Sequence, residues 1–159
     1  PLRSLYRIIV DEGNSYPHDS FPDHDSFMDY WFRGKTTVAA YAPDRERGKT
    51  MAGAFYLKPN WPGRAGHIAN AGFIVAPAWR GTGLGRLLGT TMLDYARQLG
   101  YRGVIFNLVF SENLRARRLW EQLGFSQLGM VPGAVRKNDG CYQDAIMMFR
   151  SLIDSPPHP

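Results

Sequence analysis

The sequence predicts a single α/β domain built on a mixed, mostly antiparallel sheet, and three observations lead to this fold class. Residues 35–42 and 50–57 are rich in β-branched, aromatic and small residues and flank a polar turn, which is typical of an antiparallel hairpin. Residues 65–99 read as a strand, a glycine-rich turn and a helix in direct succession. With 159 residues and 44% hydrophobic content, the chain is long enough for one domain with a buried core and a small-molecule cleft.

The first third of the chain predicts a strand, a loop and a short helix ahead of the hairpin. The apolar run at residues 5–10 is suited to a first strand. Residues 11–25 are rich in Pro, His, Asp and Ser and predict a loop. Residues 26–32 favour a short helix whose aromatic side chains cover one side of the cleft. After the hairpin, two prolines and two glycines in residues 58–66 predict another loop.

The rest of the chain predicts strands and helices in alternation. Strands are expected at residues 65–75, 101–110, 126–131 and 141–152, and helices at residues 83–99 and 111–123. The first of these helices has an apolar stripe at helical spacing, formed by Leu84, Leu87, Leu88, Met92, Ala96 and Leu99. Ser111 with the acidic Glu112 predicts the start of the second helix. The domain is expected to span residues 1–154, with a disordered tail at 155–159.

Composition limits the classes of partner. The net charge of +5 implies an anionic partner, and Arg115, Arg117 and Arg118 form a small basic cluster. Because the chain has no long Lys/Arg run and no recognised nucleic-acid motif, nucleic acid is not the expected partner. No run approaches the 18 apolar residues that a membrane helix needs, so we expect no membrane contact.

The single cysteine, Cys141, excludes an internal disulfide framework and cannot build a metal site by itself. We therefore expect no metal and a reducing, cytoplasmic location. The first residue is Pro1 rather than Met, which leaves open an organellar targeting segment ahead of the sequence and the chance that the chain is part of a longer protein.

An anion-binding turn is predicted where Arg80, Gly83 and Gly85 are spaced as R-x-x-G-x-G at the start of a helix. Glycine lets the backbone approach a ligand closely, and the first amides of a helix are unpaired. A P-loop is excluded, because the only Gly-Lys-Thr tail, at residues 48–50, lacks the earlier glycine. A dinucleotide fingerprint is also excluded, because the next strand, residues 104–110, contains no acidic residue. An ordinary glycine-rich surface turn remains open, as does a site for the diphosphate of coenzyme A, which is what the family resemblance described below implies.

Two asparagines interrupt successive apolar strands. Asn70 lies within residues 65–75, and Asn107 lies within residues 101–110. A buried amide must be hydrogen-bonded, so each asparagine either satisfies neighbouring backbone or faces a polar ligand. The functional interpretation is that the two strands separate here and leave amide groups free to bind a ligand in the gap.

The helix after the second strand places Asn113, Ala116 and Trp120 along one face, in the pattern N-x-x-A-x-x-x-W-E-x-L-G-F. The R-x-x-G-x-G turn resembles motif A of the GNAT superfamily of N-acetyltransferases, and this helix resembles the second GNAT signature. The resemblance implies acetyl-CoA as co-substrate and a sheet of about seven strands, flanked by helices, with a V-shaped split between the strands of Asn70 and Asn107. It implies coenzyme contacts from Phe73, Ile74, Val75, Arg80, Gly81, Thr82, Gly83, Leu84, Gly85, Arg86, Asn113, Ala116 and Trp120.

The sequence departs from the family pattern at the expected acid and base. Trp120 stands where these enzymes commonly have a tyrosine that protonates the leaving thiolate, and an indole N–H cannot practically give up its proton. Tyr95, Tyr101 and Tyr142 are candidate substitutes. Neither asparagine strand carries the usual carboxylate base, and His67 is a candidate, although a lone histidine in a strand is more often structural.

A narrower resemblance concerns the acceptor. The stretches N-A-G-F-I-V at Asn70 and F-N-L-V-F at Asn107 resemble the fungal acetyltransferases that detoxify proline analogues such as azetidine-2-carboxylate. This resemblance implies that Asn70 and Asn107 are catalytic, that the substrate is a small amine and that the protein is a homodimer. We expect direct transfer to an amino acid or proline analogue, with proximity supplying most of the rate. The alternatives are a protein, histone or polyamine acetyltransferase and a non-catalytic acyl-CoA sensor.

Overall fold

Six strands form one sheet in the computed structural model, which describes residues 1–46 and 48–153. The sheet order is β1-β2-β3-β4-β6-β5, and every neighbouring pair is antiparallel except β3 and β4. The strands are β1 (Thr36–Asp44), β2 (Gly48–Pro59), β3 (Ile68–Val75), β4 (Gly103–Phe110), β5 (Ser126–Arg136) and β6 (Tyr142–Ser151). The helices are α1 (Leu2–Glu12), α2 (His24–Trp31), α3 (Leu84–Gln98) and α4 (Leu114–Gln122). The expected tail at residues 155–159 lies outside the described residues.

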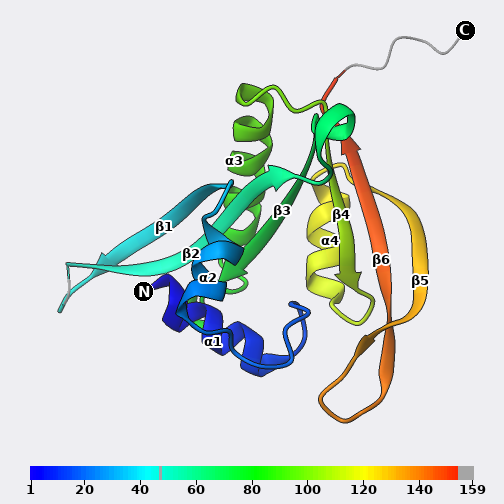
Figure 1. Cartoon of the computed structure of the whole chain (residues 1–159). Helices are drawn as coiled ribbons and strands as arrows, with labels where there is room; N and C mark the ends of the chain where they lie inside the picture. Colours follow the sequence, from blue (N-terminus) through cyan, green and yellow to red (C-terminus); the bar gives the residue numbers. More distant parts are fainter. Residues whose placement is uncertain (47, 154–159) are drawn as a thin grey trace, which may run out of the picture.

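The predicted V-shaped split is present between β3 and β4. These parallel strands pair only at Ile68 with Gly103 and at Ala69 with Val104. Beyond these two pairs the strands diverge like the arms of a V (Figure 1). The last pair lies one residue before Asn70, so the split begins at Asn70, and from there on the facing edges of β3 and β4 no longer pair with each other.

The prediction of a first strand at residues 5–10 is wrong, and this accounts for six strands instead of about seven. The segment belongs to α1, whose buried side chains are Leu2, Leu5, Tyr6, Ile9 and Val10. Their spacing of three, one, three and one is that of one helix face. Ile8 is 45% exposed because it lies on the opposite face. The β-branched residues at the end of this run favour a strand by propensity alone, and burial of the helical face overrides that preference.

Two hydrophobic clusters cover the two faces of the sheet. Helices α3 and α4 pack on the face that carries Ala69 and Ala71, whereas α1 and α2 pack on the face that carries Tyr56 and Ile74. Because neighbouring residues of a strand point to opposite faces, Asn70 shares its face with Ile74 and lies on the side of α1 and α2.

The apolar stripe of α3 is only partly the one expected. Leu88, Met92 and Ala96 are buried, but Leu87 is 62% exposed and Leu99 is 51% exposed. Leu87 lies outside the arc that faces the sheet, and Leu99 follows the last helical residue.

Candidate active site

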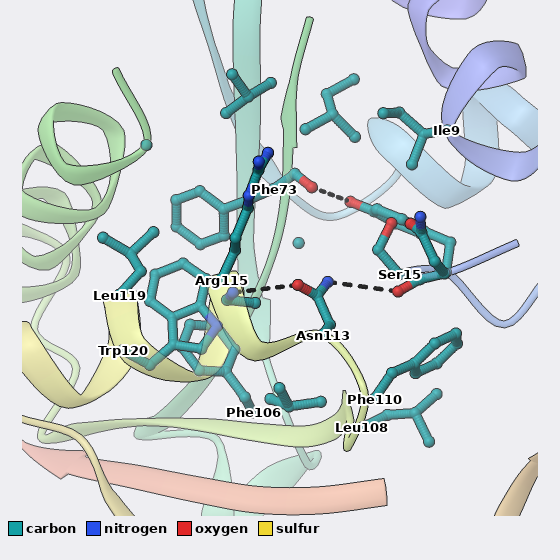
Figure 2. Close-up of a pocket in the computed structure, with 18 of the residues that line it drawn as sticks. Ile9, Ser15, Phe73, Phe106, Leu108, Phe110, Asn113, Arg115, Leu119 and Trp120 are labelled. Atoms are coloured by element: carbon teal, nitrogen blue, oxygen red, sulfur yellow. Dashed lines mark hydrogen bonds between the residues drawn. The ribbon is translucent and has the colours of Figure 1, made fainter. Parts of the chain in front are cut away.

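A cleft of about 1400 Å³ opens where β3 and β4 separate. Its walls come from both strands, the turn after β3, the start of α4 and the segment that follows α1. In Figure 2, the aromatic side chains of Phe73, Phe106 and Trp120 lie on one side of this cleft, and the segment of Ile9 and Ser15 lies on the other. The cleft therefore brings together most of the residues that the sequence singled out.

The turn before α3 has the geometry of an anion site. Gly81 and Gly83 have φ angles of 78° and 91°, and an added Cβ at either position would meet no atom within 4 Å. The first intrahelical bond of this turn is donated by the Leu87 amide to the Gly83 carbonyl, at 3.1 Å. The three preceding amides, at residues 84–86, are thus the unpaired donors of the helix start. An anion above this turn can approach them closely.

The other predicted side chains of the turn serve the protein itself. The Thr82 hydroxyl donates to the Trp79 carbonyl at 2.8 Å, and the Leu84 side chain packs against the core. A Cβ on Gly85 would lie 3.3 Å from Leu119 of α4, so this glycine also allows α3 and α4 to approach each other.

The positive charge of the turn is distributed differently from the sequence expectation. Arg80 forms an ion pair with Glu12 at 2.8 Å, and its Nε donates to the Val75 carbonyl at 3.3 Å. Both charged side chains of this pair are less than one third exposed. Arg80 therefore holds α1 against the end of β3 and shares its charge with a carboxylate. Arg86 is exposed and lines the cleft, and unlike Arg80 it forms no ion pair with a carboxylate of the described residues, so more of its charge is available to a ligand.

The basic cluster seen in the sequence belongs in part to this cleft. Arg115 and Arg118 of α4 line it, together with Arg80, Arg86 and Lys137. The carboxylates of Glu12, Glu112 and Asp139 also line it, and each is paired with Arg80 or Lys137. The excess of cations makes the cleft a site for an anionic ligand.

The inner edge of β3 presents backbone groups to the split. The Ala76 amide donates a hydrogen bond to the Ala52 carbonyl of β2. In an antiparallel ladder every second pair of opposed residues is hydrogen-bonded, so the next bonded pair along β3 is Ile74 with Ala54. Ile74 thus bonds to β2, and Phe73 and Val75 face the split. Their carbonyls accept hydrogen bonds from the Tyr16 hydroxyl and the Arg80 guanidinium. Their amides remain available to a ligand.

Asn113 is the N-cap of α4, which corrects the expected start at Ser111. Its Oδ1 accepts from the Ala116 amide at 3.1 Å, and its Nδ2 donates to the Asn14 carbonyl at 3.4 Å. The two bonds are visible as dashed lines in Figure 2, where Asn113 lies between α4 and the segment of Ser15. The segment of residues 13–17 therefore contacts both arms of the split, because Tyr16 bonds to β3 and Asn14 bonds to Asn113.

Trp120 belongs to an aromatic stack that forms one wall of the cleft. Its ring centroid lies 4.4 Å from that of Phe106 and 4.9 Å from that of Phe73. The side chain is 6% exposed. Within the part of the chain that the structure describes, its indole N–H has no hydrogen-bond partner. This nitrogen is also not fully buried, so solvent or a ligand can reach it. This N–H is a free donor at the cleft.

The two predicted asparagines meet, and a third asparagine joins them. Asn70 Nδ2 donates to Asn107 Oδ1 at 3.2 Å and to Asn60 Oδ1 at 2.8 Å. Asn107 Nδ2 donates to the same Asn60 oxygen at 3.1 Å. The sequence analysis missed Asn60 because it lies in the loop after β2, and only the antiparallel pairing of β2 with β3 brings it to Asn70.

Three tyrosines line the cleft: Tyr16 and Tyr56, which the sequence analysis missed, and Tyr30, which belongs to the segment 26–32 whose aromatic side chains were expected there. The Tyr56 hydroxyl donates to that of Tyr30 at 3.3 Å. Burial is the main cause that raises the pKa of each of these tyrosines above its usual range. The candidate acids and base named from the sequence do not line the cleft: Tyr95, Tyr101, Tyr142 and His67. No periodic signal marks the three cleft tyrosines, because they come from a loop, a helix and a strand.

Cys141 is exposed and does not line the cleft. Across residues 1–46 and 48–153, no cluster of three His, Cys, Asp or Glu side chains could hold a metal ion. None of the helices in these same ranges is long and apolar enough to cross a membrane.

Comparisons with known proteins agree with this geometry. The model of the acetyltransferase (GNAT) family matches residues 2–125. N-acetyltransferase aca1 of Schizosaccharomyces pombe is 36% identical over 162 residues, which covers 92% of this chain and 78% of the relative. A GCN5-related N-acetyltransferase from Kribbella flavida superposes with a TM-score of 0.84 at 33% identity, covering 94% of this chain and 89% of its own.

A second solved structure shares the fold at lower identity. The phosphinothricin acetyltransferase from Sinorhizobium meliloti, in complex with acetyl-CoA, has a TM-score of 0.82 and 22% identity, and covers 95% of this chain and 81% of its own.

Proposed function

Because this chain belongs to the acetyltransferase (GNAT) family, it is an acyltransferase, and we propose that it moves acetyl from acetyl-CoA directly to the amine of an amino acid or proline analogue. The observation that carries the choice of acceptor is the cluster of Asn60, Asn70 and Asn107 at the point where β3 and β4 separate. Three amides in hydrogen-bond contact form a polar surface at the closed end of the split, which suits a small polar substrate.

The coenzyme fits the unpaired donors of the cleft. Acetyl-CoA would supply an activated thioester. Its diphosphate would accept hydrogen bonds from the amides of residues 84–86, where Gly81 and Gly83 leave the approach open, and Arg86 would add charge. Arg115 and Arg118 extend the positive surface along α4.

Transfer would proceed by direct attack of the amine on the thioester. The neutral amine nitrogen forms a bond to the carbonyl carbon, the carbon–sulfur bond breaks, sulfur leaves with the electron pair as thiolate, and the nitrogen releases its proton to water. The amides of Phe73 and Val75 are positioned to stabilise the charge on the carbonyl oxygen. The Trp120 N–H can donate a hydrogen bond to the thiolate without transferring its proton. The exposed Cys141, outside the cleft, takes no part.

Asn70 is the residue that we assign to orient the amine. Its Nδ2 hydrogens are engaged by Asn60 and Asn107, whereas its Oδ1 accepts no hydrogen bond from the described residues. This oxygen can accept an N–H of the substrate and aim the nitrogen lone pair at the thioester. Holding two reactants in attack geometry contributes roughly 7–11 kcal/mol to lowering the barrier in favourable cases.

The test is an acetylation assay with purified protein, acetyl-CoA and a panel of amines, following thiol release. The panel contains azetidine-2-carboxylate, proline, a polyamine and a lysine peptide. We expect thiol release with the first two, and Asn107→Ala should lower kcat more than it weakens coenzyme binding measured by calorimetry. Release only with the polyamine or the peptide would overturn the acceptor class. Coenzyme binding without release for any amine would favour a non-catalytic sensor.

We also propose that the protein is a homodimer. Large apolar side chains are exposed on β5 and β6, where Leu128 is 58% exposed, Met130 50% and Tyr142 67%. Exposed apolar side chains on the edge strand β5 and on its neighbour favour association with a second copy. The mass in solution, measured by light scattering during size-exclusion chromatography, tests this; a monomer at micromolar concentration would contradict it.

A further inference from the structure

We propose that Lys58, supported by Lys35, forms a carboxylate-binding subsite beside the asparagine cluster, so that the acceptor is an amine that carries a neighbouring carboxylate. This inference rests on the proposed acetyl transfer and specifies its substrate class. It assigns a role to two cations that no part of the coenzyme site uses.

Lys58 lies directly opposite Asn70 in the sheet. The antiparallel ladder between β2 and β3 pairs these two residues. Side chains of directly opposed residues lie on the same face, with Cβ atoms about 4.5–5.5 Å apart. Lys58 also lines the cleft and is half-buried. Its ammonium therefore lies within reach of a group bound at the Asn70 oxygen.

Lys58 lacks a partner of its own. Among residues 1–46 and 48–153 its ammonium forms no ion pair and no hydrogen bond. The carboxylates that line the cleft are already engaged, because Glu12 pairs with Arg80 and Glu112 pairs with Lys137. A half-buried cation at a ligand site, without a protein carboxylate, is a ready partner for an anionic group of the ligand.

Lys35 adds a second cation on the same side. Its ammonium lies 5.7 Å from the ring centroid of Tyr56 and 5.8 Å from that of Tyr30, both of which line the cleft. It donates to the Asp29 carbonyl at 2.5 Å, while the Asp29 carboxylate pairs with Arg33.

Burial is the main cause that lowers the pKa of Lys35, and the neighbouring Lys58 charge lowers it further. An anion bound at Lys58 would reduce the repulsion between these two like charges. The carboxylate of an amino acid is such an anion.

The subsite also helps to supply the missing base. An ammonium of ordinary pKa, about 10.4, must lose a proton before it can attack, and neither asparagine strand carries a carboxylate to accept it. A nearby positive charge disfavours the protonated form of an amine. Lys58 would therefore hold the carboxylate and also lower the pKa of the adjacent amine. The same cations would repel a polyamine, which has no carboxylate.

The test compares binding of azetidine-2-carboxylate and of azetidine, which lacks only the carboxylate, to protein saturated with coenzyme A. Calorimetry measures both without requiring turnover. We expect the wild type to bind azetidine-2-carboxylate more tightly, and Lys58→Met to weaken that binding roughly 10- to 100-fold, as for loss of a charge-assisted hydrogen bond. Binding of azetidine should not weaken, because it has no carboxylate to lose and Lys58 repels its ammonium.

Two further variants make the result specific. Lys58→Arg keeps the charge and should restore most of the affinity, whereas Lys49→Met removes an exposed cation of the same strand and should leave both affinities unchanged. Thermal unfolding confirms that each variant is folded. If Lys58→Met weakens the binding of azetidine-2-carboxylate and azetidine equally, or weakens neither, the subsite is overturned. It is also overturned if the wild type binds azetidine as tightly as azetidine-2-carboxylate. If the wild type binds azetidine-2-carboxylate selectively but releases no thiol from acetyl-CoA, the proposed transfer fails and the subsite stands.

Discussion

Replacing Asn60 by alanine tests whether the three asparagines work as one unit. Asn60 Oδ1 accepts two hydrogen bonds, at 2.8 Å from Asn70 and at 3.1 Å from Asn107. At a net 0.5–1.5 kcal/mol for each bond, Asn60→Ala should lower the free energy of unfolding by about 1–3 kcal/mol. In a chain of this length, each 1 kcal/mol corresponds to a fall in Tm of roughly 2–4 °C.

The catalytic effect should exceed the stability effect. Without Asn60, the Asn107 amide keeps only its bond from Asn70, so both side chains can reorient. Misplacement of a positioning group by about 1 Å can cost roughly 100-fold, so we expect kcat to fall about 10- to 100-fold. The affinity for coenzyme A should stay within about twofold, because the diphosphate site lies at the other end of β3.

Steady-state thiol release, calorimetry of coenzyme binding and thermal unfolding measure the three quantities. Gln98→Ala, which removes an exposed amide at the end of α3, is the matched control and should leave all of them unchanged. In the double variant Asn60→Ala with Asn107→Ala, kcat should fall by less than the product of the two single losses. The difference should correspond to an interaction energy of about 0.5–3 kcal/mol between the two side chains. Full kcat in Asn60→Ala, or strictly multiplicative losses, would refute the idea of one unit.

Three other predictions concern packing, capping and pH. Gly89→Val should destabilise the protein by about 1–3 kcal/mol in thermal unfolding, because the new Cβ would lie 2.4 Å from the side chain of Leu123, the C-cap of α4; an unchanged Tm would contradict this close approach. Asn113→Ala should cost about 1 kcal/mol of stability through loss of the α4 cap, whereas an aspartate there should retain it; equal Tm values for the two variants would be the wrong result. Burial lowers the pKa of His18, which is hydrogen-bonded to the Tyr6 hydroxyl. As the pH falls, His18 is therefore protonated in the unfolded chain at a higher pH than in the folded protein. Stability should therefore decline as the pH falls below about 6.5, and His18→Gln should reduce this decline in urea titrations; an identical pH dependence in both proteins would disprove it.

Elements with strong local signals were predictable from the sequence. The hairpin of β1 and β2 and helix α3 follow from turn chemistry, apolar spacing and glycine stops. Helix α1 was missed because Ile8, Ile9 and Val10 favour a strand in a short window. A window that began at Leu2 and weighed Leu5 with Ile9 would have shown the helical period.

The candidate site was predictable where a motif or an unusual residue marks it. Asn70 and Asn107 stand out as amides in apolar strands, and the structure places them in contact. Asn60 and Tyr16 are ordinary loop residues in the sequence, and they reach the site only through the sheet register and the path of the segment after α1. The ion pair that reduces the free charge of Arg80 was also not predictable, because Glu12 is 68 positions away.

A crystal structure of the protein with coenzyme A tests the central claim most directly, namely that the start of α3 holds the diphosphate while the reacting end lies beside the asparagines. We predict diphosphate oxygens at about 2.7–3.2 Å from the amides of residues 84–86 and the thiol in the split between Phe73 and Asn107. A diphosphate bound anywhere else on the protein, or a thiol outside the split, would contradict the account.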